Sequence, residues 1–275
     1  MWQLLADYLW LCLTAFLAGG INALAGGGTL LTFPMLSSVL TPQFGKAAGV
    51  LANGTSTVAL VPASIGSSWG FRREMYQLRR LLVWLIPPSV LGGAVGAWVL
   101  VQNPDQFNAL IPWLILTAAA LFTLQPYVVR RLTRVAARAH DLSDGDTPIS
   151  RRSVAGMMLL QFFISVYGGY FGAGIGILML SGLGLMGLSN VHQMNGLKSI
   201  LASIINGVAV VVFIWKGNVV WRYALAMMAA SLVGGFLAAH YSRRIAGRYV
   251  RWFVIVVGFL LAAWYFATTY LFPEI

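Results

Sequence analysis

Long apolar runs constrain this chain more than any other feature, because about 20 apolar residues suffice to cross the hydrocarbon core of a bilayer as a helix. The sequence has eight long runs and two shorter ones. The long runs lie at 5–24, 47–68, 81–101, 108–127, 153–171, 195–215, 221–240 and 250–272, and the short ones at 29–40 and 175–188. We therefore predict an all-α polytopic membrane protein with eight full spans and two short or broken segments.

Composition excludes the common soluble classes. Hydrophobic residues make up 59% of the 275-residue chain and charged residues only 9%, whereas soluble domains carry about 25% charged residues. Cys12 is the one cysteine, so no intramolecular disulfide can form. The first apolar run has no Lys or Arg before it, which favours a retained helix over a cleaved signal peptide.

The basic residues predict how the chain is oriented. The net charge is +11, but the Lys and Arg residues gather in short loops, which indicates membrane orientation and not nucleic-acid binding. Three segments are basic: 72–80, the linker at 128–152, and 243–251. Ten crossings put all three basic segments on one side of the membrane and both termini on the other. Eight crossings would instead place the segments at 72–80 and 243–251 on opposite sides. We therefore expect a cytoplasmic linker and extracytoplasmic termini in a bacterial-type inner (cell) membrane.

Motifs of the first half of the chain recur in the second half. The matched pairs are Gly26-Gly27-Gly28 with Gly172-Ala173-Gly174, Asn53-Gly54 with Asn195-Gly196, and Ser89 and Gly92-Gly93 with Ser231 and Gly234-Gly235. The order of these matches predicts a first membrane repeat at 1–127, the linker at 128–152 and a second membrane repeat at 153–275. About five segments per half make the two repeats inverted in the membrane, as in many secondary transporters. Chance recurrence among 30 glycines is the alternative.

The glycine clusters stand between a long and a short apolar run. Consecutive glycines weaken a helix, so a half-helix beginning at Thr29 would direct its free N–H groups and its dipole toward a cavity. Gly27, Gly28 and Thr29 are the predicted donors, and Gly174 belongs to the symmetric cluster. The alternative is close helix packing through small residues. We assign that packing role to Gly92, Gly96 and Gly234.

The span after each cluster carries polar residues on one helical face. The positions on this face are Asn53, Ser56, Thr57, Leu60 and Ser64 in the first half, and Asn195, Lys198, Ser199, Ala202 and Asn206 in the second, of which Leu60 and Ala202 are apolar. Lys198 is the most informative, because a lysine within a span costs at least about 2.5 kcal/mol and its segment offers no carboxylate. An unpaired cation on a polar face favours an anionic ligand. The alternative is a lysine that snorkels to the headgroups.

These motifs resemble the sulfite exporter TauE/SafE family of membrane permeases. The resemblance covers essentially the whole chain, and its most specific piece is Asn195-Gly196-Leu197-Lys198-Ser199. The second glycine cluster departs from the family's triple glycine at Ala173, and Leu180 replaces the proline that the first half has at Pro34. The resemblance implies export or uptake of sulfite, sulfonates or related small organic anions.

We predict a secondary transporter that moves a small anion, sulfite or an organosulfonate, by alternating access around a midplane site. Lys198 would supply charge, while Asn53, Thr57, Asn195, Ser199 and Asn206 would supply side-chain hydrogen bonds. No nucleotide-binding, metal-ligand or Ser-His-acid pattern is present, so we expect no cofactor and no enzymatic activity. The expected partners are the anion and membrane lipid, and we expect no nucleic acid. The sequence leaves open whether the protein forms a homodimer. An anion channel or an intramembrane enzyme is the alternative.

Overall fold

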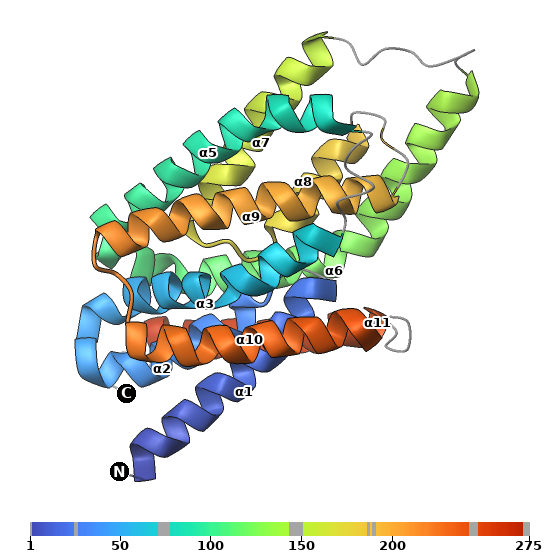
Figure 1. Ribbon diagram of the computed structural model, residues 1–275. Coiled ribbons are helices and arrows are strands. Elements are labelled where there is room, and N and C mark those ends of the chain that lie inside the picture. The colour runs from blue at the N-terminus through green and yellow to red at the C-terminus, as the bar shows by residue number, and fades with distance from the viewer. Residues whose placement is uncertain are drawn as a thin grey trace.

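The computed structural model describes residues 2–24, 27–70, 78–142, 151–185, 188, 191–241 and 247–271. The regular structure in these residues is helical throughout (Figure 1). The helices are α1 (Trp2–Leu24), α2 (Thr29–Phe44), α3 (Ala48–Gly70), α5 (Arg79–Gln102), α6 (Pro104–Leu142), α7 (Arg151–Tyr170), α8 (Ile175–Leu185), α9 (Val191–Trp215), α10 (Trp221–Tyr241) and α11 (Gly247–Phe266). A 3₁₀ turn at Gly45–Ala47 joins α2 to α3, and a π-helical turn at Ala267–Leu271 ends the described chain.

The helices confirm the predicted all-α membrane protein, with a different count of spans. Seven segments of the described chain are long and apolar enough to cross a membrane, and one of them, Thr29–Gly66, contains both α2 and α3. Val154–Tyr170 and Ile175–Leu185 are shorter apolar helices. Helix α7 has 20 residues, and Val154–Tyr170 is its apolar part.

Helix α6 is much longer than its apolar run predicts. It has 39 residues and continues to Leu142, so the first part of the linker at 128–152 is helical. Its sequence from Arg130 on is rich in Arg, Ala and Leu, which are strong helix formers. Figure 1 shows this end of α6 projecting beyond the other helices. The turn-rich centre at 143–150 lies outside the described residues.

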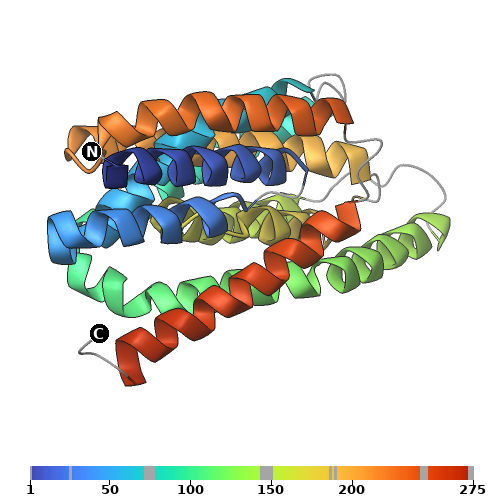
Figure 2. The same cartoon turned by 90° about the horizontal axis from the view of Figure 1, so that it is seen from below.

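Both chain termini lie on one side of the helix bundle. Figures 1 and 2 show the start of α1, the end of α11 and the α2–α3 turn together at that side. The ends of α3, α6 and α10 lie at the opposite side, where α5, α7 and α11 begin. The helix ends that flank all three basic segments therefore share one side, opposite the termini.

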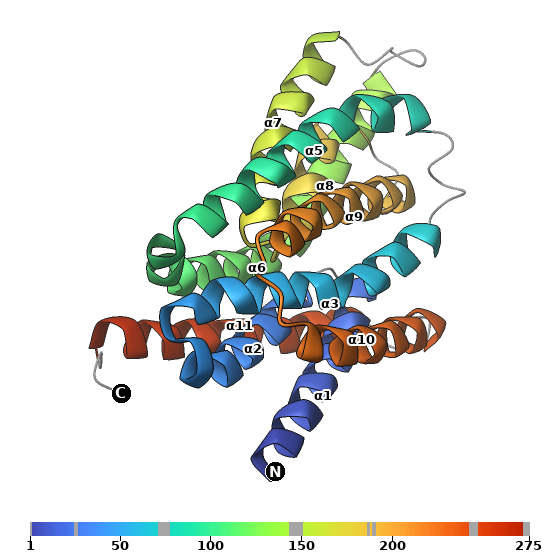
Figure 3. The same cartoon turned by 60° about the vertical axis from the view of Figure 1, so that its left-hand side comes forward.

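Two helix pairs make the closest contacts, and both pairs join one half of the chain to the other. Helix α1 packs on α10, and α5 packs on α7 (Figure 3). A Cβ atom on Gly234 of α10 would lie 1.9 Å from the Phe16 carbonyl oxygen of α1, and one on Gly96 of α5 would lie 2.0 Å from the Val166 carbonyl oxygen of α7. Only glycine permits backbones this close, which confirms the predicted packing role of these glycines.

Candidate functional site

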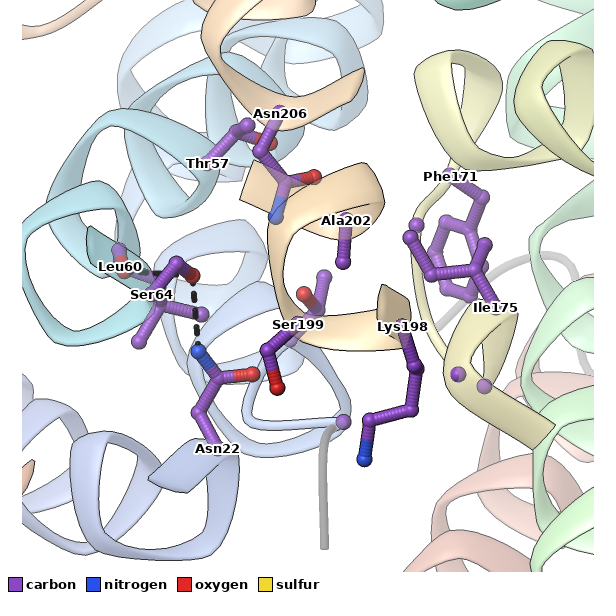
Figure 4. Close-up of a pocket in the computed structure, with 15 residues that line it drawn as sticks. Asn22, Thr57, Leu60, Ser64, Phe171, Ile175, Lys198, Ser199, Ala202 and Asn206 are labelled. Atoms are coloured by element: carbon purple, nitrogen blue, oxygen red, sulfur yellow. Dashed lines mark hydrogen bonds between the residues drawn. The ribbon is translucent and has the colours of Figure 1, made fainter. Parts of the chain in front are cut away.

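A cavity of about 50 Å³ lies in the interior, where α3 and α9 face the starts of α2 and α8 (Figure 4). Fifteen residues line it, and seven of them are among the ten predicted site residues. Those seven are Gly27, Thr29, Thr57, Gly174, Lys198, Ser199 and Asn206. The other eight are Asn22, Leu60, Ser64, Phe171, Gly172, Ile175, Gly176 and Ala202.

Left-handed glycines make the two chain breaks at which α2 and α8 begin. Gly27 has a φ of +114°, and a Cβ atom there would lie 2.2 Å from Phe122 Cζ. Gly172 and Gly174 both have a φ of +82°. L-residues with side chains rarely adopt such angles, so these positions require glycine for the chain to turn from one helix into the next.

The turns leave backbone N–H groups beside the cavity. In α2 the first amide with a backbone acceptor among the described residues is that of Leu30, which donates to the Gly27 oxygen over 3.1 Å. In α8 it is that of Ile177, which donates to the Gly174 oxygen over 3.0 Å. The amides of Thr29, Ile175 and Gly176 precede these bonds, and all three residues line the cavity. Two positive helix ends therefore meet the same space.

Lys198 brings a full positive charge to the cavity. Its stem passes the start of α8 so closely that a Cβ atom on Gly176 would lie 3.0 Å from Lys198 Cδ. Figure 4 shows the ammonium group pointing into the space that Asn22 and Ser199 also face. Within the described part of the chain, Lys198 has no hydrogen-bond or ion-pair partner. Asp7 and Asp105, the carboxylates whose side chains the structure describes, belong to α1 and to the beginning of α6.

Neutral polar side chains complete the lining. Asn22 of α1 donates from Nδ2 to Ser64 Oγ of α3 over 2.9 Å, and Ser64 Oγ donates to the Leu60 oxygen over 3.1 Å. Thr57 donates to the Asn53 oxygen over 2.7 Å. Figure 4 shows Thr57 of α3 beside Asn206 of α9 at one end of the cavity. The cavity therefore offers one cation and a set of neutral hydrogen-bonding groups.

Three predicted site residues lie outside the lining. Gly28 packs against α1, where a Cβ atom would lie 2.5 Å from the Ala18 oxygen. Asn53 is buried and donates from Nδ2 to the Tyr170 oxygen over 3.2 Å. Asn195 is partly buried on α9. A binding role for the ten predicted residues stays a prediction. Among these three, Gly28 and Asn53 make structural contacts, whereas the geometry indicates no particular role for Asn195.

Sequence reasoning missed Asn22, whose only signal is an amide side chain within the apolar first run. Gly176 belongs to the second glycine cluster that the sequence analysis recognised, but it was not singled out as a site residue. Phe171 was missed because an aromatic residue in an apolar segment carries no functional signal. Within the described residues, no group of three His, Cys, Asp or Glu side chains could hold a metal ion.

A cluster of aromatic rings includes Phe171, which lines the cavity. Phe171 packs edge-on against Phe33 of α2, with ring centroids 5.5 Å apart. Phe107, near the start of α6, contacts both rings at 6.0 Å and 6.4 Å. Thr55 Oγ1 also accepts the Val220 amide over 3.0 Å, which ties α3 to the segment before α10. Rings from α2, α6 and the α7–α8 turn therefore pack together beside the cavity.

Comparison with known proteins places the chain among membrane transporters. Residues 11–265 match the family described as sulfite exporter TauE/SafE. A probable membrane transporter protein of Haemophilus influenzae is 27% identical over 90% of both chains. Probable membrane transporter protein YfcA of Escherichia coli K12 is 26% identical over 90% of this chain and 86% of its own. A Sinorhizobium protein, ORF9, also named a probable membrane transporter protein, is 24% identical over 92% and 89%.

No solved structure matches this chain. The family match covers almost the whole sequence, including every helix that lines the cavity. The chain thus belongs to the sulfite exporter TauE/SafE family, whose members are multi-pass membrane transporters and not enzymes.

Proposed function

We propose that the protein is a secondary transporter that carries a small anion, sulfite or an organosulfonate, across the cell membrane through the central cavity. The observation that carries this proposal is the Lys198 ammonium group, which lines the cavity without a counterion among the described residues. A charged side chain at this depth is costly and usually functional. An anionic substrate is the natural counterion for it.

The helix ends around Lys198 support an anion as well. The N-termini of α2 and α8 both border the cavity. Each helix end carries partial positive charge and free N–H groups, which favour anion binding. Half-helices that point their N-termini at an anionic group near the midplane are a recurring design of secondary transporters.

The size of the cavity favours a small ion. A water-sized position needs about 10–15 Å³, so a cavity of about 50 Å³ offers about four such positions. That space suits a pyramidal or tetrahedral oxyanion such as sulfite or the head group of a sulfonate. A longer organosulfonate would require the cavity to widen around its chain.

The inverted-repeat architecture is part of this proposal, and the helix packing supports it. Gly92 of α5 stands against the Phe162 oxygen of α7, and Gly234 of α10 stands against the Phe16 oxygen of α1. These contacts are equivalent in the alignment of the halves, because Gly92 and Gly234 are a matched pair, and Phe16 and Phe162 each lie ten residues before the matched glycines Gly26 and Gly172. Rocking of such repeats around a fixed site gives alternating access. The aromatic packing of Phe33, Phe107 and Phe171 would form the closed side.

The orientation in the membrane is also proposed. The exposed residues Arg79, Arg80, Arg130 and Arg131 belong to the helix ends opposite the termini. Short basic segments face the cytoplasm, so both termini would be extracytoplasmic. Reporter fusions after Pro273 should be active only in a periplasmic reporter. Activity restricted to a cytoplasmic reporter would reverse the orientation.

Two experiments test the function itself. Purified protein should be stabilised against heat by at least one member of a panel of sulfite, thiosulfate, taurine and sulfoacetate, and more than by carboxylates, because a ligand that binds the folded state raises its stability. Liposomes containing the protein should then show saturable counterflow of the stabilising anion. Transport that never saturates and lacks counterflow would indicate a channel, and a panel without any stabilising anion would contradict the proposal.

A further inference from the structure

The orientation of the Asn22 amide is determined by its neighbour on α3. Ser64 has one hydroxyl proton, which it donates to the Leu60 oxygen over 3.1 Å. Ser64 Oγ can therefore only accept from Asn22, at 2.9 Å. The NH₂ group of the amide must face Ser64, and Oδ1 must face the other way. The hydrogen-bond network thus settles which end of this amide is the oxygen.

The oxygen of Asn22 faces the cavity. Figure 4 shows Oδ1 directed away from Ser64, toward the side of Ser199 and Lys198. Among the described residues, no side chain or backbone amide donates to it. An oxyanion that presents only unprotonated oxygens would place an acceptor against this acceptor, and an acceptor left without a donor is costly in a secluded site. A ligand that carries a proton of its own would satisfy Asn22.

The charge of the lining points to the same class of ligand. Lys198 is the titratable side chain among the residues that line the cavity, and α1, α2, α3 and α8 contribute none to it. Tyr167 of α7 lies behind the α7–α8 turn, where its hydroxyl donates to the Ala173 oxygen over 2.8 Å. The two helix ends add about half an elementary charge each. They stabilise an ionised ligand, while the Asn22 oxygen distinguishes a protonated anion from an unprotonated one.

We infer that the cavity selects a singly charged anion that also carries a hydrogen-bond donor, with its anionic oxygen at Lys198 and its proton at Asn22 Oδ1. This inference rests on the proposed function and specifies its substrate class. It includes the protonated form of a divalent oxyanion and a small sulfonate that bears a hydroxyl group. It excludes dianions and monoanions without a donor.

Three small probes of similar size separate these cases. Sulfite changes from a protonated monoanion to a dianion near neutral pH, sulfate is a dianion without a proton, and methanesulfonate is a monoanion without a donor. In calorimetric titrations of the purified protein at about pH 6, sulfite should bind at least about tenfold more tightly than the other two, since an unmet acceptor costs about that factor. At about pH 8, sulfite should lose most of this advantage over methanesulfonate.

Methanesulfonate also controls for any change in the charge of Lys198, because the charge of methanesulfonate is constant between about pH 6 and pH 8. The ratio of sulfite to methanesulfonate affinity therefore reports the ligand's proton alone. Sulfate or methanesulfonate binding as tightly as sulfite at pH 6, or a ratio that does not fall with pH, overturns the inference and leaves the proposed function standing. Failure of all three probes to bind at either pH counts against the proposed function itself.

Variants of Asn22 locate the effect. Asn22→Leu removes Oδ1 at similar volume, so the preference for sulfite over methanesulfonate should fall from about tenfold to about one. Asn22→Ala tests the same loss if the leucine variant does not fold. Ser203→Ala is the matched control, because Ser203 donates to the Ser64 oxygen over 3.1 Å without lining the cavity. An unchanged preference in a folded Asn22 variant, or an equal loss in the control, overturns the inference.

Discussion

Helices α3 and α9 carry the same spacing of polar residues and use it differently. In α3, Asn53 is bound to the Tyr170 oxygen, and Ser56, which is fully buried, shares a hydrogen bond of 2.5 Å with Thr32 Oγ1. In α9 the position that matches Ser56 is Lys198, which lines the cavity. At this matched position, α3 therefore has a serine in a packing contact, whereas α9 has a lysine at the cavity.

The difference teaches that two helices with the same spacing of residues can place that face differently, one in packing contacts and the other at a cavity. The two copies still share the cavity through Thr57 and Ser199, which are equivalent in the alignment of the halves. Among the described residues that line the cavity, however, the charged one, Lys198, belongs to α9. The site is therefore asymmetric even where the sequence pattern is symmetric, and substitutions at matched positions should have unequal effects.

The largest effect should follow from removing the cation. Lys198→Ala should weaken anion binding about 10- to 100-fold, because a charge-assisted hydrogen bond contributes about 1.5–3 kcal/mol. Lys198→Arg should retain part of the affinity, and Lys198→Glu should be worst. The control is Lys216→Ala, since Lys216 lies over the Trp98 ring at 4.2 Å and away from the cavity. Parent-like affinity in Lys198→Ala, measured by calorimetry, would remove Lys198 from the site.

A smaller effect should follow from moving the cation without deleting it. Gly176→Ala places a Cβ atom 3.0 Å from Lys198 Cδ, so the lysine stem must shift and binding should weaken about tenfold. Gly207→Ala on α9 is the matched control, because no atom lies within 4 Å of its added methyl group. If both variants bind the anion like the parent protein, the position of the ammonium group does not matter for affinity.

The smallest effect on binding should come from the matching position in α3. Ser56→Ala removes the partner of Thr32 and should lower the free energy of unfolding by about 1 kcal/mol, with anion affinity unchanged. Thermal unfolding in detergent and calorimetry measure the two quantities on one sample. The control is Ser38→Ala, an exposed position on α2 that should change neither. A selective loss of affinity in Ser56→Ala would show that both halves bind the ligand.

Much of the fold follows from the sequence, because hydrophobic runs reveal helices in lipid directly. Each of the ten apolar runs corresponds to a helix in the described residues. The extension of α6 to Leu142 was missed, since the prediction followed hydropathy and the extension depends on helix propensity.

Site residues could be predicted where the spacing of polar residues places them on one face of a single helix. They could not be predicted where a contact joins residues far apart in the sequence. Lys198, Ser199 and Asn206 share a face of one helix, and the structure places all three at the cavity. Asn22 meets Ser64 across 42 residues of sequence, so no local pattern signals it. Asn53 has the right residue type and spacing, yet its donor is used by the Tyr170 oxygen, which only the tertiary packing reveals.

The close packing of α1 on α10 has a consequence for how the chain is made. Gly19 and the Phe16 oxygen of α1 lie against Ser231 and Gly234 of α10, which the ribosome adds more than 200 residues later. Synthesis proceeds from the N-terminus, so α1 must wait in the bilayer with this small-residue surface covered by lipid or by another membrane protein. A nascent chain that stops before α10 cannot complete this contact and should be a substrate for membrane quality control.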